Sequence, residues 1–155
     1  MRWVFFALAC LSVVACSDDR LYEDHMAFKQ RAWDAKVIPA FEFEVDQPAT
    51  LPIYYTVRNS LDYPYARLFV KYSLHDSTGS VLESKLVSNY LFDQKTGEPF
   101  GQSGLGDVFD HRFALSPGFS FRAKGKYQVR LEQFMRQDTL KGILAVGVRV
   151  EIPAP

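Results

Sequence analysis

Residues 41–57 read FEFEVDQPATLPIYYTV, in which apolar side chains recur at every second position. A period of two is typical of strands that bury one face and leave the other in water. The expected inward positions are Phe41, Phe43, Val45, Leu51, Ile53, Tyr55 and Val57. The stretch therefore predicts two strands of an antiparallel sheet.

The same period continues towards the end of the chain. Further strands are expected over residues 66–75, 81–92, 112–121, 127–131 and 144–152. Turn-forming residues separate them, as in Asp76-Ser77-Thr78-Gly79, and no long segment has a helical period. Seven to eight such strands predict an all-β fold, an antiparallel β-sandwich of the immunoglobulin-like or jelly-roll-like kind. A closed barrel is the alternative, because alternation alone does not distinguish the two.

Two strands carry finer expectations. In residues 81–92, Leu82, Leu86, Tyr90 and Phe92 are expected to share one face. In residues 112–121, a break is expected at Pro117-Gly118, because proline supplies no backbone donor to a sheet.

The first fifteen residues, MRWVFFALACLSVVA, predict a signal peptide, residues 1–15. One basic residue precedes an apolar run that is too short to span a bilayer. Val13-Val14-Ala15-Cys16 resembles the lipobox of bacterial lipoproteins, in which a small residue precedes the cysteine that receives the lipid. Cys16 is therefore the expected lipidation site and the first residue of the mature protein, which membrane lipid would hold through its acyl chains.

Cysteine and charge counts exclude several function classes. The chain has two cysteines, and Cys10 would leave with the signal peptide while Cys16 is acylated, so no thiol remains for a disulfide, a nucleophile or a metal. The mature chain would carry 17 basic and 18 acidic residues, since Arg2 is the one charge of the signal. No basic excess is available for a nucleic-acid partner.

The organisation expected after processing is a lipidated tether, residues 16–35, followed by a β-sandwich domain, residues 36–155. The tether is polar and aperiodic, although a short helix around Glu23–Ala32 is an alternative, and Trp33 is expected to pack where the domain begins. Ser17-Asp18-Asp19 resembles an acidic signal for surface export, or else simply solvates the tether.

Residues that could carry catalysis are few. His25, His75 and His111 have no metal-ligand spacing, and no cofactor motif is present. The glycines of residues 101–106 lie in an expected long loop, residues 93–110, without the lysine of a phosphate-binding loop. Asp107, Asp110 and His111 are close in sequence and form the one candidate cluster, with a solvated loop as the alternative. The chain is therefore expected not to be an enzyme.

Several stretches resemble one known family. They are Val57-Arg58-Asn59-Ser60-Leu61-Asp62-Tyr63-Pro64-Tyr65-Ala66-Arg67-Leu68-Phe69, Gly104-Leu105-Gly106-Asp107-Val108, Gly125-Lys126-Tyr127, Met135-Arg136, Gly142-Ile143 and Val146-Gly147-Val148-Arg149. In order and spacing they are similar to the gliding-motility lipoprotein H (GldH) family of the Bacteroidota. The resemblance implies an outer-membrane lipoprotein that serves gliding motility and type IX secretion, with other envelope proteins of that machinery as partners.

The resemblance supplies no catalytic residues. Tyr63, Pro64, Tyr65 and Asp107 are therefore candidates for a partner contact, and a structural corner is the alternative reading of the tyrosines and the proline. A lipid-anchored protein that binds glycans or another small ligand through aromatic residues near residues 93–110 is the alternative function. An unrecognised hydrolase using Asp107, Asp110 and His111 is a third hypothesis.

Overall fold

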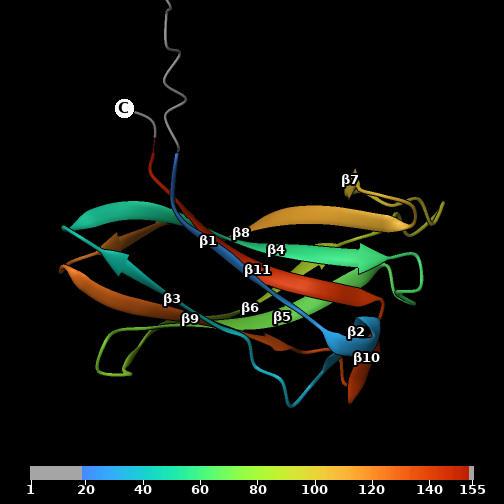
Figure 1. Cartoon of the computed structure of the whole chain (residues 1–155), viewed down its shortest axis with the longest axis horizontal. Helices are drawn as coiled ribbons and strands as arrows, with labels where there is room; N and C mark the ends of the chain where they lie inside the picture. The colour runs from blue at the N-terminus through green and yellow to red at the C-terminus, as the bar shows by residue number, and fades with distance from the viewer. Residues whose placement is uncertain (1–18, 154–155) are drawn as a thin grey trace, which may run out of the picture.

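Two antiparallel sheets lie face to face in the computed structural model, which describes residues 19–153 (Figure 1). The upper layer has the strand order β1-β11-β4-β8-β7 and the lower layer β3-β9-β5-β6. The upper strands are β1 (Arg20–Ala27), β4 (Ala49–Ser60), β7 (Gln102–Ser103), β8 (Val108–Phe121) and β11 (Ile143–Glu151). The lower strands are β3 (Ala40–Val45), β5 (Arg67–His75), β6 (Val81–Tyr90) and β9 (Gly125–Gln133). The predicted antiparallel sandwich is confirmed, and the two separate sheets exclude the barrel.

A small third sheet lies at one end of the sandwich. It pairs β2 (Ala32–Asp34) with β10 (Thr139–Lys141), directly after a single 3₁₀ turn, η1 (Lys29–Arg31). Trp33 in β2 is fully buried, stacks on Phe28 and donates its indole N–H to the carbonyl of Val37 at 2.9 Å. Trp33 therefore belongs to the core, as expected of it.

Alternate residues of the facing strands form the core. All seven apolar positions expected of residues 41–57 are buried, and so are the inward residues of β5 and β9. These last are Leu68, Val70, Tyr72, Leu74, Tyr127, Val129 and Leu131. Strand alternation thus sets which side chains hold the two layers together.

The first strand corrects the expected tether. Residues 20–27 form β1, which pairs with β11 from Arg20–Glu151 to Ala27–Ala145. The folded domain therefore begins near Arg20 rather than at residue 36, and the helix considered around Glu23–Ala32 is absent. The expected signal peptide and Cys16 lie outside the described residues.

Strands β6 and β8 differ from expectation in detail. The pairing of Val70 with Val87 turns Lys85 and Val87 of β6 inward, so Leu86 faces solvent, while Leu82 lies at an irregularity of the pairing and is also exposed. Strand β8 runs unbroken through Pro117-Gly118, because irregular pairing with β4 around Leu51 and Ile53 accommodates the two residues.

Candidate functional site

Tyr63 forms the corner where the chain passes from β4 in the upper layer to β5 in the lower layer. Its hydroxyl donates to the carbonyl of Arg67 at 2.9 Å, and its ring packs edge-on against Tyr65 and stacks on Phe92. Burial raises the pKa of the Tyr63 hydroxyl, so it remains a donor. Tyr63 is therefore a structural corner residue, whereas Pro64 and Tyr65 are exposed.

Gly142 fits against this corner. Its φ is +79°, and a Cβ there would lie 2.3 Å from the backbone nitrogen of Tyr63. Its N–H donates to the carbonyl of Arg31 and its carbonyl accepts from the N–H of Ser60, both at 2.9 Å. Glycine at this position thus joins three distant segments of the chain.

Asp107 meets the same corner. Its carboxylate accepts a hydrogen bond from Nη2 of Arg31 at 3.0 Å, and the same nitrogen lies 4.0 Å from the carboxylate of Asp62. The backbone carbonyl of Asp107 accepts from the N–H of Leu61 at 3.1 Å. The structure therefore brings Asp107 beside the loop that carries Tyr63, Pro64 and Tyr65.

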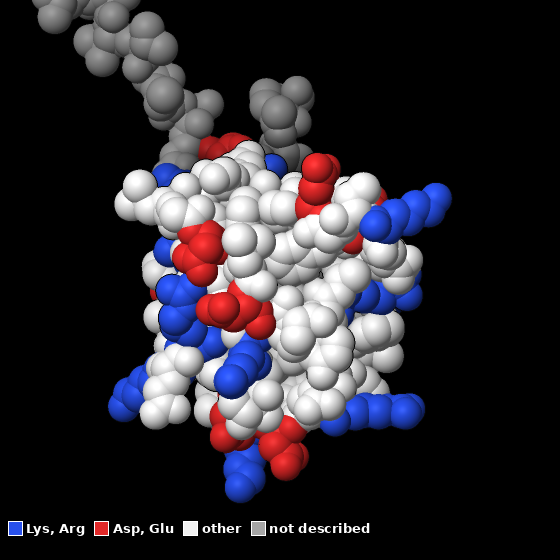
Figure 2. All heavy atoms as spheres, turned by 90° about the vertical axis from the view of Figure 1, so that its right-hand side faces the viewer, with Lys and Arg blue, Asp and Glu red and all other residues white. Residues whose placement is uncertain are grey.

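Exposed apolar side chains surround the Arg31–Asp107 ion pair. Leu105 is 95% exposed and Leu61 57%, and Tyr65 is also exposed. We call this surface the corner end and define it by Arg31, Leu61, Pro64, Tyr65, Leu105 and Asp107. Figure 2 faces this end of the sandwich and shows a largely uncharged surface with acidic and basic side chains interspersed.

The candidate catalytic cluster does not form. Alternation along β8 sends Asp110 outward, where it pairs with Arg58 at 2.7 Å, and His111 inward, where it stacks on Phe113. Asp107 is held by Arg31 instead. No group of three or more metal-binding side chains exists between residues 19 and 153.

His111 is a buried polar residue that lies beside Phe113 and Gly101. Its Nε2 has no hydrogen-bond partner, and a Cβ on Gly101 would lie 2.6 Å from it. Burial lowers the pKa of His111, partly opposed by the nearby carboxylate of Asp110. The imidazole is therefore held neutral.

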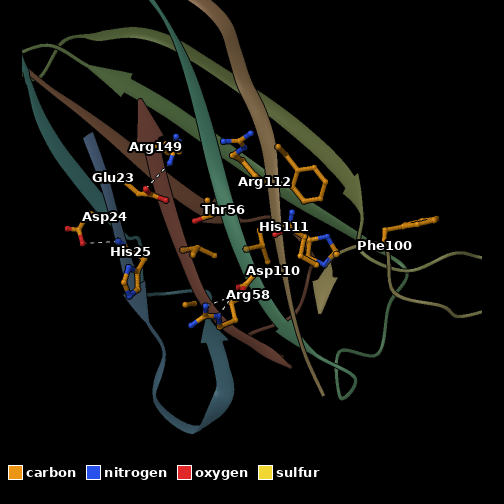
Figure 3. Close-up of a pocket in the computed structure, with 16 residues that line it drawn as sticks. Glu23, Asp24, His25, Thr56, Arg58, Phe100, Asp110, His111, Arg112 and Arg149 are labelled. Carbon is orange, nitrogen blue, oxygen red and sulfur yellow. Dashed lines mark hydrogen bonds and ion pairs between the residues drawn. The ribbon is translucent and has the colours of Figure 1, made fainter. Parts of the chain in front are cut away.

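A hollow of about 730 Å³ lies on the outer face of the upper sheet (Figure 3). Thr56 of β4 and His111 of β8 are among the residues that line it. Arg58 and Arg112 line the hollow, and Phe100 of the 93–110 loop stands at one side. The predicted long loop thus borders a cavity, at the place where the alternative function put a small-ligand site.

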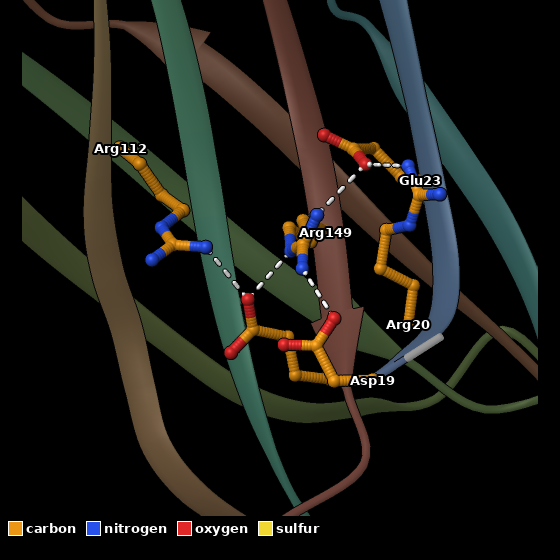
Figure 4. A network of polar contacts seen from close by, with 6 residues as sticks. Asp19, Arg20, Glu23, Arg112 and Arg149 are labelled. Atoms are coloured by element: carbon orange, nitrogen blue, oxygen red, sulfur yellow. Dashed lines mark hydrogen bonds and ion pairs between the residues drawn. The ribbon is translucent and has the colours of Figure 1, made fainter. Parts of the chain in front are cut away.

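Arg149 ties the first and last strands together beside the hollow (Figure 4). Its guanidinium contacts the carboxylates of Asp19 at 2.9 Å and Glu23 at 3.0 Å, and also pairs with Glu151. Glu151 in turn accepts from Arg112 at 2.7 Å. The hydrogen bond from Arg20 and the charge of Arg149 lower the pKa of Glu23, so the network stays ionised. The sequence signal for it was limited to an arginine in an otherwise apolar strand.

Solved structures of similar arrangement are distant. The VP2 particle of infectious bursal disease virus is 12% identical, with a TM-score of 0.41 over 85% of this chain and 30% of that one. PorU of Porphyromonas gingivalis is 9% identical, with a TM-score of 0.39, and the match covers 86% of this chain and 13% of that one. A xylan-binding CBM22 domain from Paenibacillus barcinonensis is 10% identical, with a TM-score of 0.36, and the match covers 88% of this chain and 97% of that one. Such low scores carry no inference about function.

Sequence comparisons are more specific. A curated protein of Christiangramia forsetii, the "Gliding motility lipoprotein GldH homolog", is 27% identical over 154 residues, which covers 94% of this chain and 92% of that protein. Within residues 19–153 no helix has the length and apolar character needed to cross a membrane. The family model described as GldH lipoprotein matches residues 20–150, from the start of β1 almost to the end of β11. The chain therefore belongs to the GldH lipoprotein family.

Proposed function

We propose that this protein is an outer-membrane lipoprotein that acts as a non-catalytic interaction component of the gliding-motility and type IX secretion machinery. Its membership of a lipoprotein family, one curated member of which is named for gliding motility, supports this role. The observation that carries it is the corner end, where a rigid turn presents exposed apolar side chains around one ion pair.

The corner end has the properties of a protein-binding surface. Exposed leucine and tyrosine side chains become contact anchors when a partner buries them, and a charged pair beside them sets orientation. Tyr63 and Gly142 hold the loop that carries Leu61 and Tyr65 in place. A preorganised loop loses little entropy on binding.

The anchor is proposed to be Cys16. Family membership implies attachment to a membrane through lipid, and Cys16 is the cysteine that a lipobox precedes. Strand β1 begins four residues after Cys16, and its eight residues span about 26 Å. The strand therefore leads from the anchor side towards η1 and the corner end.

The test is a pair of substitutions, Leu61→Asp and Leu105→Asp, introduced into the full chain in a gliding host. Both side chains are exposed, so protein level and fold should persist, while colony spreading and type IX export should fall to the level of a deletion strain. Ile152→Asp is the matched control, because Ile152 is an exposed apolar residue that directly follows β11, away from the corner end. Normal spreading and export in the deletion strain itself would refute the proposed role.

The hollow supports a second candidate function, binding of a glycan or another small polar ligand of the envelope. Its paired arginines and carboxylates offer hydrogen bonds to hydroxyl groups, and Phe100 offers an apolar surface beside them. A glycan array probed with the wild-type chain and with Phe100→Ala tests this. Binding that depends on Phe100 would favour the second function, and no binding to any glycan would argue against it.

A further inference from the structure

Strand β6 is the last strand of the lower sheet and has a free edge. Its one pairing partner is β5, and no other strand between residues 19 and 153 pairs with it. It is ten residues long, with one irregularity in its pairing with β5, between Val81 and Glu83. An edge of this length offers a row of unpaired backbone donors and acceptors to another strand.

Exposed side chains lie on both faces of β6 over its first half, although the Glu83 side chain is only 19% exposed. Lys85 belongs to the face that points towards the upper sheet, yet its side chain is 55% exposed, and Val81 beyond the irregularity is 59% exposed. Leu82 and Leu86 on the opposite face are also exposed. The upper layer therefore covers this half of β6 only in part, and the exposed side chains lie within reach of a strand added to its edge.

The sequence of β6 is complementary to itself when reversed. Residues 81–87 read V-L-E-S-K-L-V, with Ser84 at the centre. When two copies run antiparallel with Ser84 opposite Ser84, each apolar residue faces its own kind and Glu83 of each copy faces Lys85 of the other. The opposite pairs are then Val81 with Val87, Leu82 with Leu86 and Glu83 with Lys85, each occurring twice.

We propose that two copies of this chain associate through antiparallel pairing of their β6 strands, with Ser84 on the twofold axis. Apolar and opposite-charge pairs across neighbouring strands are the pairs that stabilise a sheet. A shift of the register by two residues in either direction places Glu83 opposite Glu83 or Lys85 opposite Lys85. The charges therefore select one register, and the lower sheets of the two copies join into one.

The direction of the axis suits two membrane anchors. A twofold axis between paired edge strands is normal to the joined sheet, along the direction in which the two layers are stacked. Strand β1 begins on the upper-sheet side of the molecule (Figure 1). Rotation about the axis keeps both β1 strands on that side, so both copies can be attached to one membrane. Attachment also raises the effective concentration of each copy for the other.

Cross-linking in the native membrane tests the proposal with the full chain carrying Ser84→Cys. Directly opposite residues of antiparallel strands have Cα atoms about 4.5–5.5 Å apart, which lies within the range of a disulfide. Mild oxidation should convert most of this variant into a disulfide-linked dimer. Wild-type chain should give none, and Ser88→Cys should give little, because its two copies would lie about 27 Å apart.

Charge reversal tests the register independently of any one variant's fold. In the Ser84→Cys background, Glu83→Lys alone and Lys85→Glu alone should each lower the dimer yield about fivefold, because like charges then face each other twice. Co-expression of the two reversed chains should restore cross-linking between them. That rescue cannot arise within one chain, because residues 83 and 85 of each reversed chain carry the same charge and repel each other.

Three results would overturn the proposal. One is an oxidised Ser84→Cys variant that stays monomeric although a maleimide labels its thiol. Another is equal cross-linking of Ser84→Cys and Ser88→Cys, which would mean random collision. The third is cross-linking of Ser84→Cys to a different protein, which would assign the free edge to another partner.

Discussion

Gly142 holds the most constrained backbone position of the corner end. An alanine there would have to adopt a positive φ and would also place its Cβ against the backbone of Tyr63. We expect Gly142→Ala to lower the free energy of unfolding by about 3 kcal/mol. Gly79→Ala is the control, since Gly79 has a similar φ of +84° with open space around it, and it should cost about 1 kcal/mol. If chemical denaturation gave the same loss of unfolding free energy for both variants, the close approach of residue 142 to Tyr63 would contribute nothing to the effect of Gly142→Ala.

His111 makes stability depend on pH. Burial lowers its pKa in the folded protein below the ordinary value of 6.5, so below that pH the unfolded chain binds a proton that the folded chain does not. Stability from this residue is complete above pH 6.5 and decreases as pH falls from 6.5 towards the folded pKa.

The test compares denaturant unfolding at pH 7.5 and 5.5. From pH 7.5 to 5.5, the free energy of unfolding of the wild-type protein should fall by up to about 1 kcal/mol more than that of His111→Gln, because one pKa unit corresponds to about 1.4 kcal/mol. The same loss in both proteins would mean that His111 is not held neutral.

Several individual residues of the candidate site could be identified from the sequence. Tyr63, Pro64, Tyr65 and Asp107 were identified from their motifs, and the structure brings them together. The partner that holds Asp107 could not be foreseen, because Arg31 lies 76 residues away. The Asp107, Asp110 and His111 cluster failed for a local reason, since adjacent residues of a strand point to opposite faces.

At the scale of elements, β1 depends on Arg149. This arginine joins Asp19 and Glu23 to Glu151, and its side chain is only 14% exposed. We expect Arg149→Met to destabilise the protein by about 2 kcal/mol, because three carboxylates lose a shared partner. Hydrogen exchange should accelerate most at residues 20–23. Lys126→Met is the control: it removes an exposed ion pair with Glu42 and should change neither the free energy of unfolding nor the hydrogen exchange of β1. Unchanged exchange in β1 of Arg149→Met would contradict this role.

Alternation of apolar residues predicted the strands correctly where one face of the strand is buried, and it failed where neither face is buried. The segments around Phe43, Tyr55, Tyr72 and Val129 alternate cleanly because the opposite sheet covers one side of each. Strand β1 reads RLYEDHMA and lies at a sheet edge with most of its residues exposed, so burial imposes no period on it. In β6 the leucines imitate a buried face, although the pairing with β5 turns them to solvent.

At the scale of the whole molecule, Cys16 is expected to decide where the protein resides. Cys16→Ala should abolish labelling with radioactive palmitate and move the chain from the membrane to the soluble fraction, because no acyl chain would remain to hold it. Cys10→Ala is the matched control and should keep both the label and the membrane location. Retention of Cys16→Ala in the membrane fraction would assign the attachment to another feature.

The place of β11 in the upper sheet governs how the chain can fold as it emerges. Strand β11 lies between β1 and β4, yet it leaves a ribosome or a translocon after every other strand of residues 19–153. Until residue 151 is delivered, the sheet lacks an interior strand and β1 has nothing to pair with. The described domain therefore cannot complete its fold before residue 151 has emerged. A stop codon at position 143 would remove β11 and leave β1 and β4 without the strand that joins them.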